Sequence, residues 1–198
     1  MRKKLNELEN KINAAFKELQ KLKKQCRKAP EIGGTVEIAG MEWTVLEKTE
    51  AGYLAITKEF ISTSTKFDSN TNNWGASDLR NYLNTEFLKK IEEDLGEGIL
   101  PEFERNLLSM DGQIEYGSCM DKVSLLTVDE YRKYRKYLPN TDKWWWTCTP
   151  WSTDERGWKY SVTVVSASGV ISYDGFDYNY GVRPFCIFPS SIFESEEE

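Results

Sequence analysis

The chain of 198 residues is 39% hydrophobic and 13% aromatic, which supplies one hydrophobic core and leaves length for one extension. Its formal net charge of −6 argues against a nucleic-acid partner, because binding to the phosphate backbone depends on an excess of Lys and Arg. No run approaches the roughly 20 apolar residues of a membrane span, and the charged N-terminus lacks the apolar core of a secretory signal, so we expect synthesis in the cytoplasm without a signal peptide and no membrane insertion.

Residues 1–29 are expected to form a coiled-coil helix that stops before Pro30. Apolar residues recur alternately three and four positions apart, which is the a and d pattern of a coiled coil. The series is Leu5, Leu8, Ile12, Ala15, Leu19, Leu22 and Cys26.

Charged residues beside this seam favour self-association. In a parallel pair of helices, Lys4 lies opposite Glu9 of the second chain and Glu18 lies opposite Lys23. An amphipathic helix that packs on its own domain is the alternative. We favour a homo-oligomer, and the seam leaves dimer or trimer open.

Residues 32–193 are expected to form a single head domain that begins with a β-meander. Three short strands are predicted at Thr35–Ile38, Trp43–Lys48 and Tyr53–Thr57, with a turn at Gly40 between the first two.

The next segment alternates between polar and amphipathic stretches. Ser62–Asn73 is polar and is predicted to be a loop. Apolar residues from Leu79 to Leu95 mark one face of a helix that Gly96 ends. Ile99–Tyr116 receives no assignment apart from a turn at Met110–Gly112.

A buried strand is predicted at Val123–Leu126. Thr127 and Glu130 then form a capping box that begins a helix running through Tyr137. The acidic tail Glu194–Glu198 is predicted to be disordered.

The segment Trp144–Phe188 holds five of the seven tryptophans. Its apolar runs predict a β-hairpin from Tyr160–Val165 and Val170–Tyr173, followed by a strand at Val182–Phe188. The residues expected to be buried scaffold are Trp144, Trp145, Trp146, Val162, Val164, Val182 and Phe185.

Between these strands lies a loop, Asp174–Gly181, which is rich in Tyr, Asp, Asn and Gly. Binding loops use these residue types for broad contact and adaptable hydrogen bonds, so the loop is our candidate working surface. The alternative is an ordinary turn whose aromatic side chains fold back into the core.

Metal and catalytic chemistry have little support in the sequence. The chain has no histidine, which removes the commonest general base, and its four cysteines are far apart with no CxxC pair. Cys148 and Cys186 are expected to be buried free thiols. Asp174, Asp177 and Asn179 have oxygen atoms that could bind calcium. We nevertheless expect no metal and no cofactor.

Several short motifs follow one another along residues 32–193. They are Met41-Glu42-Trp43-Thr44-Val45-Leu46, Asn73-Trp74, Ser77-Asp78-Leu79-Arg80, Tyr82-Leu83-Asn84, Asp121 to Leu126, Trp144-Trp145-Trp146 running into Thr147-Cys148-Thr149-Pro150, and Gly181-Val182-Arg183-Pro184. In order and spacing they resemble a family of uncharacterised domains that is common in bacteriophages and gut bacteria. That family has a C-type-lectin-like fold and includes variable proteins of diversity-generating retroelements.

The resemblance implies an α+β, C-type-lectin-like (formylglycine-generating-enzyme-like) domain. It also implies a non-enzymatic protein, encoded by a phage or prophage and displayed on a virion, that binds an unknown protein or glycan ligand. The residues that it places on the exposed binding surface are Trp151, Ser152, Thr153, Asp154, Glu155, Lys159, Tyr160, Tyr173, Asp174, Phe176, Asp177, Tyr178, Asn179 and Tyr180.

Two other functions remain open. The first is a structural virion protein, such as a capsid decoration or tail component, which contacts other virion proteins. The second is an enzyme of the formylglycine-generating or sulfatase-modifying type, whose chains end in a strand similar to Gly181-Val182-Arg183. The chemistry of those enzymes depends on suitably placed cysteines, and here only Cys186 lies near that strand.

Overall fold

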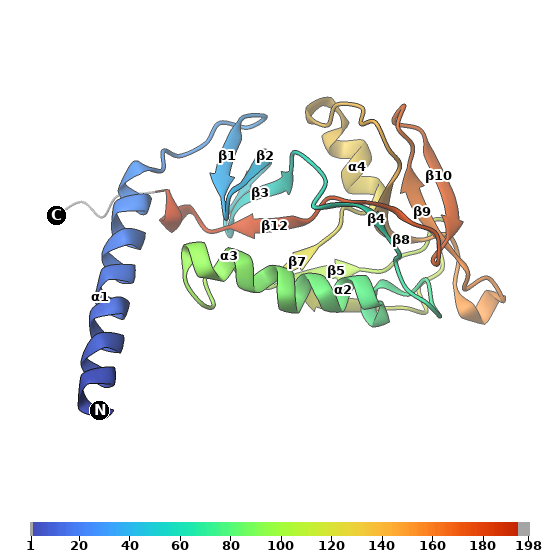
Figure 1. Cartoon of the computed structure of the whole chain (residues 1–198). Coiled ribbons are helices and arrows are strands. Elements are labelled where there is room, and N and C mark those ends of the chain that lie inside the picture. The colour runs from blue at the N-terminus through green and yellow to red at the C-terminus, as the bar shows by residue number, and fades with distance from the viewer. Residues whose placement is uncertain (1, 194–198) are drawn as a thin grey trace.

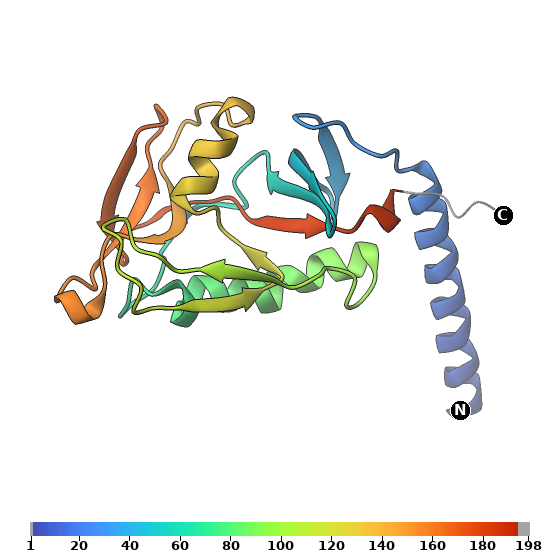
Figure 2. The same cartoon turned by 180° about the vertical axis from the view of Figure 1, so that it is seen from behind.

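The computed structural model describes residues 2–193, so the predicted disorder of Glu194–Glu198 falls outside the described residues. The protein has an α+β fold with several sheets and one long N-terminal helix, α1 (Arg2–Cys26). The rest of the chain forms an elongated head, and α1 leaves this head at one end (Figures 1 and 2).

The first sheet has five strands in the order β1-β2-β3-β12-β7, and every neighbouring pair is antiparallel. Its strands are β1 (Thr35–Ile38), β2 (Met41–Thr49), β3 (Gly52–Thr57), β12 (Phe185–Phe188) and β7 (Val123–Ser124). The meander predicted from the sequence is therefore confirmed.

The second sheet has the order β10-β9-β8-β11-β4. Its strands are β4 (Ser62–Thr65), β8 (Trp145–Pro150), β9 (Ser161–Val165), β10 (Ile171–Gly175) and β11 (Tyr180–Val182). β8 and β11 are parallel, and the other pairs are antiparallel. The predicted hairpin is confirmed as β9 and β10.

The strand predicted at Val182–Phe188 is wrong as a single element. It divides at Arg183-Pro184, so that β11 belongs to the second sheet and β12 to the first. Pro184 has no amide hydrogen to donate to a ladder, and its carbonyl accepts a hydrogen bond from the amide of Thr57 at 3.0 Å. The chain therefore passes from the second sheet to the first at Arg183-Pro184.

Two further regions contain strands that the sequence did not predict. Ser62–Asn73 is not all loop, because β4 pairs with β11 at its start. The unassigned region Ile99–Tyr116 contains β5 (Phe103–Asn106), which pairs with β6 (Ser118–Asp121) in a two-stranded sheet.

The predicted central helix is confirmed, with an irregular middle. It comprises α2 (Asp78–Tyr82), the π-helical segment η2 (Leu83–Phe87) and α3 (Leu88–Leu95). The Ser77 side chain accepts a hydrogen bond from the Arg80 amide at the start, and Gly96 with φ of 113° ends the helix.

The capping box is also confirmed. α4 (Val128–Tyr134) continues into the 3-10 turn η3 (Arg135–Tyr137). Glu130, which caps α4, also forms an ion pair with the buried guanidinium of Arg105 at 2.6 Å. One residue thus fixes the start of the helix and joins it to β5.

The core packs against both faces of the first sheet. One cluster includes Trp43, Phe87 and Phe188, and the other includes Tyr131 and Trp145. Six of the seven predicted scaffold residues are buried, and Trp144 is not. The buried ones are Trp145, Trp146, Val162, Val164, Val182 and Phe185.

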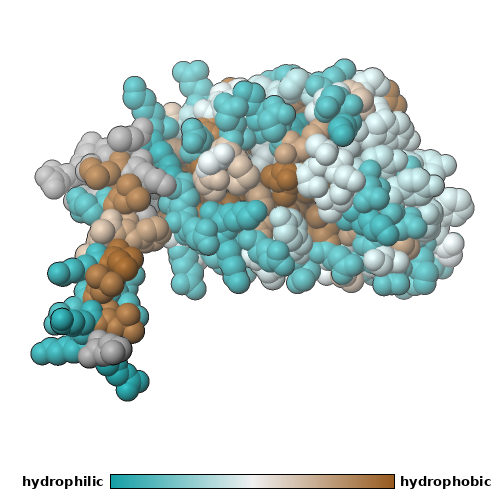
Figure 3. Space-filling model, viewed as in Figure 1, coloured by the Kyte–Doolittle hydropathy of each residue, from teal (hydrophilic) through white to brown (hydrophobic). Residues whose placement is uncertain are grey.

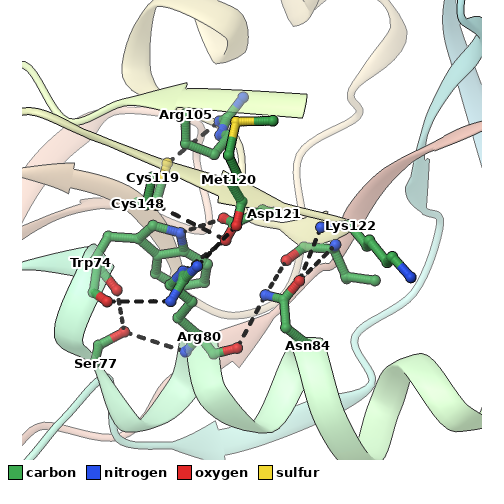
Figure 4. Close-up of polar contacts among 12 residues, drawn as sticks. Trp74, Ser77, Arg80, Asn84, Arg105, Cys119, Met120, Asp121, Lys122 and Cys148 are labelled. Atoms are coloured by element: carbon green, nitrogen blue, oxygen red, sulfur yellow. Dashed lines mark hydrogen bonds and ion pairs between the residues drawn. The ribbon is translucent and has the colours of Figure 1, made fainter. Parts of the chain in front are cut away.

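A buried polar cluster attaches the central helix to β6. Figure 4 shows the Trp74 indole and the Arg80 guanidinium converging on the carboxylate of Asp121. The Trp74 Nε1 to Oδ2 distance is 2.7 Å, and the Arg80 Nε to Oδ1 distance is 2.6 Å. Cys119 of β6 lies beside this pair, and the described cysteines Cys119, Cys148 and Cys186 are all free thiols.

Candidate functional site

The candidate surface lies at the end of the head opposite α1, where β8, β9 and β10 form the far edge of the molecule (Figures 1 and 2). We define the distal face as Trp144, Tyr160, Asp174, Asp177, Tyr178 and Tyr180. Trp144 directly precedes β8, Tyr160 directly precedes β9, and Tyr178 and Tyr180 follow β10.

Tyr160 is held by a carboxylate at the surface. Its hydroxyl donates a hydrogen bond to Asp177 Oδ1 at 2.8 Å, and its ring packs edge-on against Phe176. The hydrogen bond to the Asp177 carboxylate raises the pKa of Tyr160 to about 12, because ionisation would place two negative charges together. The exposed ring is therefore held in one orientation.

A second tyrosine is held in the same way. The Tyr180 hydroxyl donates to Asp174 Oδ2, and the Gly175 amide donates to Asp174 Oδ1 at 2.8 Å. Burial, followed by this hydrogen bond, raises the pKa of Tyr180. Trp144 stacks on the Tyr180 ring at 5.9 Å between centroids, so the exposed indole extends a fixed aromatic surface.

Two glycines permit these close approaches. A side chain at Gly175 would overlap the Tyr160 ring, and one at Gly181 would overlap the Phe60 ring. Their small size therefore serves packing on both sides of the loop.

The segment between β8 and β9 is anchored by Asn72, which the sequence did not single out. The Asn72 side-chain amide donates to the carbonyls of Ser152 at 2.9 Å and Ser161 at 2.8 Å. Its Oδ1 accepts from the Tyr116 hydroxyl at 2.7 Å. A buried amide with no partner is costly, so a fully bonded Asn72 fixes this segment.

Three predicted surface residues are not at the surface. Ser152 and Thr153 are buried and donate hydrogen bonds to Asp111 at 2.8 Å and Glu115 at 3.3 Å. Phe176 is also buried, and its carbonyl accepts from the amide of Phe67. The loop is therefore shorter than predicted, because Asp174, Gly175, Tyr180 and Gly181 lie in strands.

The remaining predicted residues do not form one face. Tyr173 and Asp174 are neighbours on β10, so their side chains point to opposite sides of the sheet. Trp151 packs on Tyr173 at 4.1 Å between centroids, away from the distal face. Asp154, Glu155, Lys159 and Asn179 are exposed, and Asp154 lies 3.7 Å from the Lys159 ammonium group.

Sequence reasoning missed Trp144 and Trp158, whose side chains are exposed. Trp144 and Trp146 both contact the Tyr180 ring, and nothing in the sequence indicates that only Trp146 is buried. Among the described residues, no group of three or more His, Cys, Asp or Glu side chains is placed to hold a metal ion. In the same part of the chain, no helix is long and apolar enough to cross a membrane.

Residues 51–190 match the model of a family described as a domain of unknown function (DUF6273). The chain belongs to the DUF6273 family. The match covers the distal face and all strands of the second sheet, whereas α1, β1 and β2 precede it. No curated protein and no solved structure matches the chain.

The DUF6273 region also contributes to a groove of about 530 Å³ between the first sheet and the central helix. Phe60, Ile61, Tyr82 and Phe87 line it together with the start of β2. Thr57 also lines it, and the buried Thr57 Oγ1 has no hydrogen-bond partner. Figure 3 shows apolar atoms in the middle of this side of the head, with hydrophilic atoms around them.

Proposed function

We propose that this DUF6273 protein is a non-enzymatic binding protein whose distal face recognises a protein or glycan ligand. The observation that carries the proposal is a pair of ordered, exposed aromatic rings at the end of the head away from α1: Tyr160 is held by Asp177, and Trp144 stacks on the half-buried Tyr180, which Asp174 holds. Rigid aromatic rings provide a large contact area at a small entropic cost, which suits a sugar ring or a protein surface.

The finer proposal is a C-type-lectin-like head, encoded by a phage or prophage and displayed on a virion, with a C-terminal surface whose sequence a diversity-generating retroelement varies. The ordered motifs from Met41 to Pro184 support it. A reverse-transcriptase gene beside a near-repeat of the region coding Trp144–Phe188 would test this origin, whereas neighbouring capsid or tail genes without them favour a structural virion protein.

The enzymatic alternative has less support. The chain has no histidine, and Cys186 is buried in β12, where burial raises the pKa of its thiol well above the usual value. A protonated and inaccessible thiol does not suit copper or thiol chemistry.

Binding of the full chain to an array of bacterial surface glycans and to intact bacterial cells tests the proposal. We expect Tyr178→Ala and Trp144→Ala to abolish binding and Met120→Ala to retain it. Met120 is a matched control, since it is 52% exposed on β6 and Tyr178 is 51% exposed. Undiminished binding by both distal variants would contradict the proposal.

The groove supports a second candidate function, the binding of a small amphipathic molecule. The mixture of apolar and charged side chains that line the groove favours it. Its rim also borders the π-helical segment η2, and such segments are frequent at functional sites. Loss of array binding in Ile61→Asp, with binding retained in Tyr178→Ala, would favour the groove over the distal face.

A further inference from the structure

The apolar seam of α1 is not covered by the head from Leu5 to Leu22. Leu5, Leu8, Ile12, Leu19 and Leu22 are each between 50% and 60% exposed. Figure 3 shows a stripe of apolar atoms along this helix, and Figures 1 and 2 show the helix pointing away from the sheets. The alternative that α1 packs on its own domain is therefore wrong for these residues.

We propose that the seam is covered by the α1 helices of further copies of this chain, in a parallel arrangement. The seam keeps its heptad spacing over the described helix, and an isolated helix that exposes such a stripe gains little stability in water. A second copy supplies the same apolar series at the same spacing. This inference does not depend on what the distal face binds.

The charged residues beside the seam favour a parallel over an antiparallel arrangement of the helices. In the parallel arrangement Lys4 lies opposite Glu9 of the neighbour, and Glu18 lies opposite Lys23. In an antiparallel arrangement centred on the seam, Lys11 lies opposite Glu18, but Arg2 then lies opposite Lys23. Like charges at such positions repel, so the parallel arrangement is favoured.

In a parallel arrangement the associated α1 helices form a stalk, and all heads lie at the same end of it. Because the head extends sideways from the upper end of α1, the distal faces of the copies would lie at the outer ends of heads that point outward from the stalk (Figure 1).

Cys26 supplies a test of direction within the native sequence, since it occupies an a position. Parallel helices bring the Cys26 positions of two chains face to face. Antiparallel helices separate them by about 35 Å at a rise of 1.5 Å per residue. Only the parallel arrangement therefore permits a disulfide between these two positions when an oxidant is added.

Sedimentation equilibrium of the full chain measures the assembly, and diamide oxidation followed by a non-reducing gel measures its direction. We expect the mass of a dimer or trimer, and a disulfide-linked pair that is lost in Cys26→Ser. Ile12→Asp with Leu19→Asp should give monomers whose heads unfold at the same temperature. The control, Asn10→Asp with Asn13→Asp at outward positions, should still assemble.

A monomeric mass for the unaltered chain would overturn the proposal. An oligomeric mass without the Cys26-dependent disulfide would overturn the parallel direction. Neither result bears on ligand binding by the distal face, which the array measurement tests separately.

Discussion

Asn72 connects parts of the chain that lie far apart in sequence. Replacing it with Ala removes one hydrogen bond each from the carbonyls of Ser152 and Ser161 and from the hydroxyl of Tyr116. We expect Asn72→Ala to lower the free energy of unfolding by about 2 kcal/mol, as measured by urea denaturation. Asn70→Ala is the control, since Asn70 is exposed and its change should cost less than about 0.5 kcal/mol. Equal effects of the two changes would contradict this role.

Asp121 accepts hydrogen bonds from both Trp74 and Arg80 and is fully buried at its side chain. Breaking a buried ion pair from one side leaves the other charge without compensation. We expect Asp121→Asn to destabilise the head by about 3 kcal/mol in the same denaturation experiment. Glu42→Gln breaks the exposed pair between Glu42 and Lys58 and should cost less than about 1 kcal/mol. A small effect at Asp121 would show that the cluster does not hold the helix to β6.

The hydrogen bond between Tyr160 and Asp177 has a definite pH dependence. The pKa of Tyr160 is raised to about 12 in the folded protein, against about 10 in an unfolded chain. The folded state therefore holds the proton more tightly, so this bond stabilises the fold below pH 10 and its contribution is lost as the pH rises towards 12. We expect the stability difference between the unaltered chain and Tyr160→Phe to shrink over that window. A difference that stays constant from pH 9 to 12 would show that the bond is absent.

At the scale of elements, local signals predicted much of the fold. The β1–β3 meander depends on turns at Gly40 and just before Gly52. The start of α4 depends on the capping box of Thr127 and Glu130. Each of these signals involves residues that are close together in the sequence. The exposed loop at Asp177–Asn179 was identified by composition. These elements depend on neighbours along the chain, which is why the sequence shows them.

The missed elements depend on distant partners. β4 is a polar strand of Ser and Thr that exists because β11 pairs with it. β5 and β6 are likewise short and mostly polar. Phe176 was assigned to the binding loop, although the surrounding core buries it. Hydrophobic pattern alone does not reveal which distant segment covers a residue.

The loop between β10 and β11 should therefore respond unevenly to substitution. Phe176→Ala removes a buried ring and should lower the free energy of unfolding by about 3 kcal/mol. Tyr178→Ala removes an exposed ring and should change it by less than about 0.5 kcal/mol. Thermal unfolding of both variants checks this contrast. If Tyr178→Ala proved as damaging as Phe176→Ala, the loop would be core rather than surface.

At the scale of the whole molecule, the head separates two surfaces. The seam of α1 lies at one end, and the distal face lies at the other (Figures 1 and 2). The first is a regular apolar stripe suited to identical copies, whereas the second is irregular and rich in tyrosine and aspartate. This separation lets assembly and binding be tested independently.

The most direct test of the binding surface is a combined change at Asp177, Tyr178 and Asn179, each to Ala, with stability and glycan-array binding measured on the same preparation. All three residues are exposed and lie between β10 and β11. We predict a free energy of unfolding within about 1 kcal/mol of the unaltered chain and a loss of binding. A head that unfolds, or one that folds and binds as before, would contradict the assignment of the distal face.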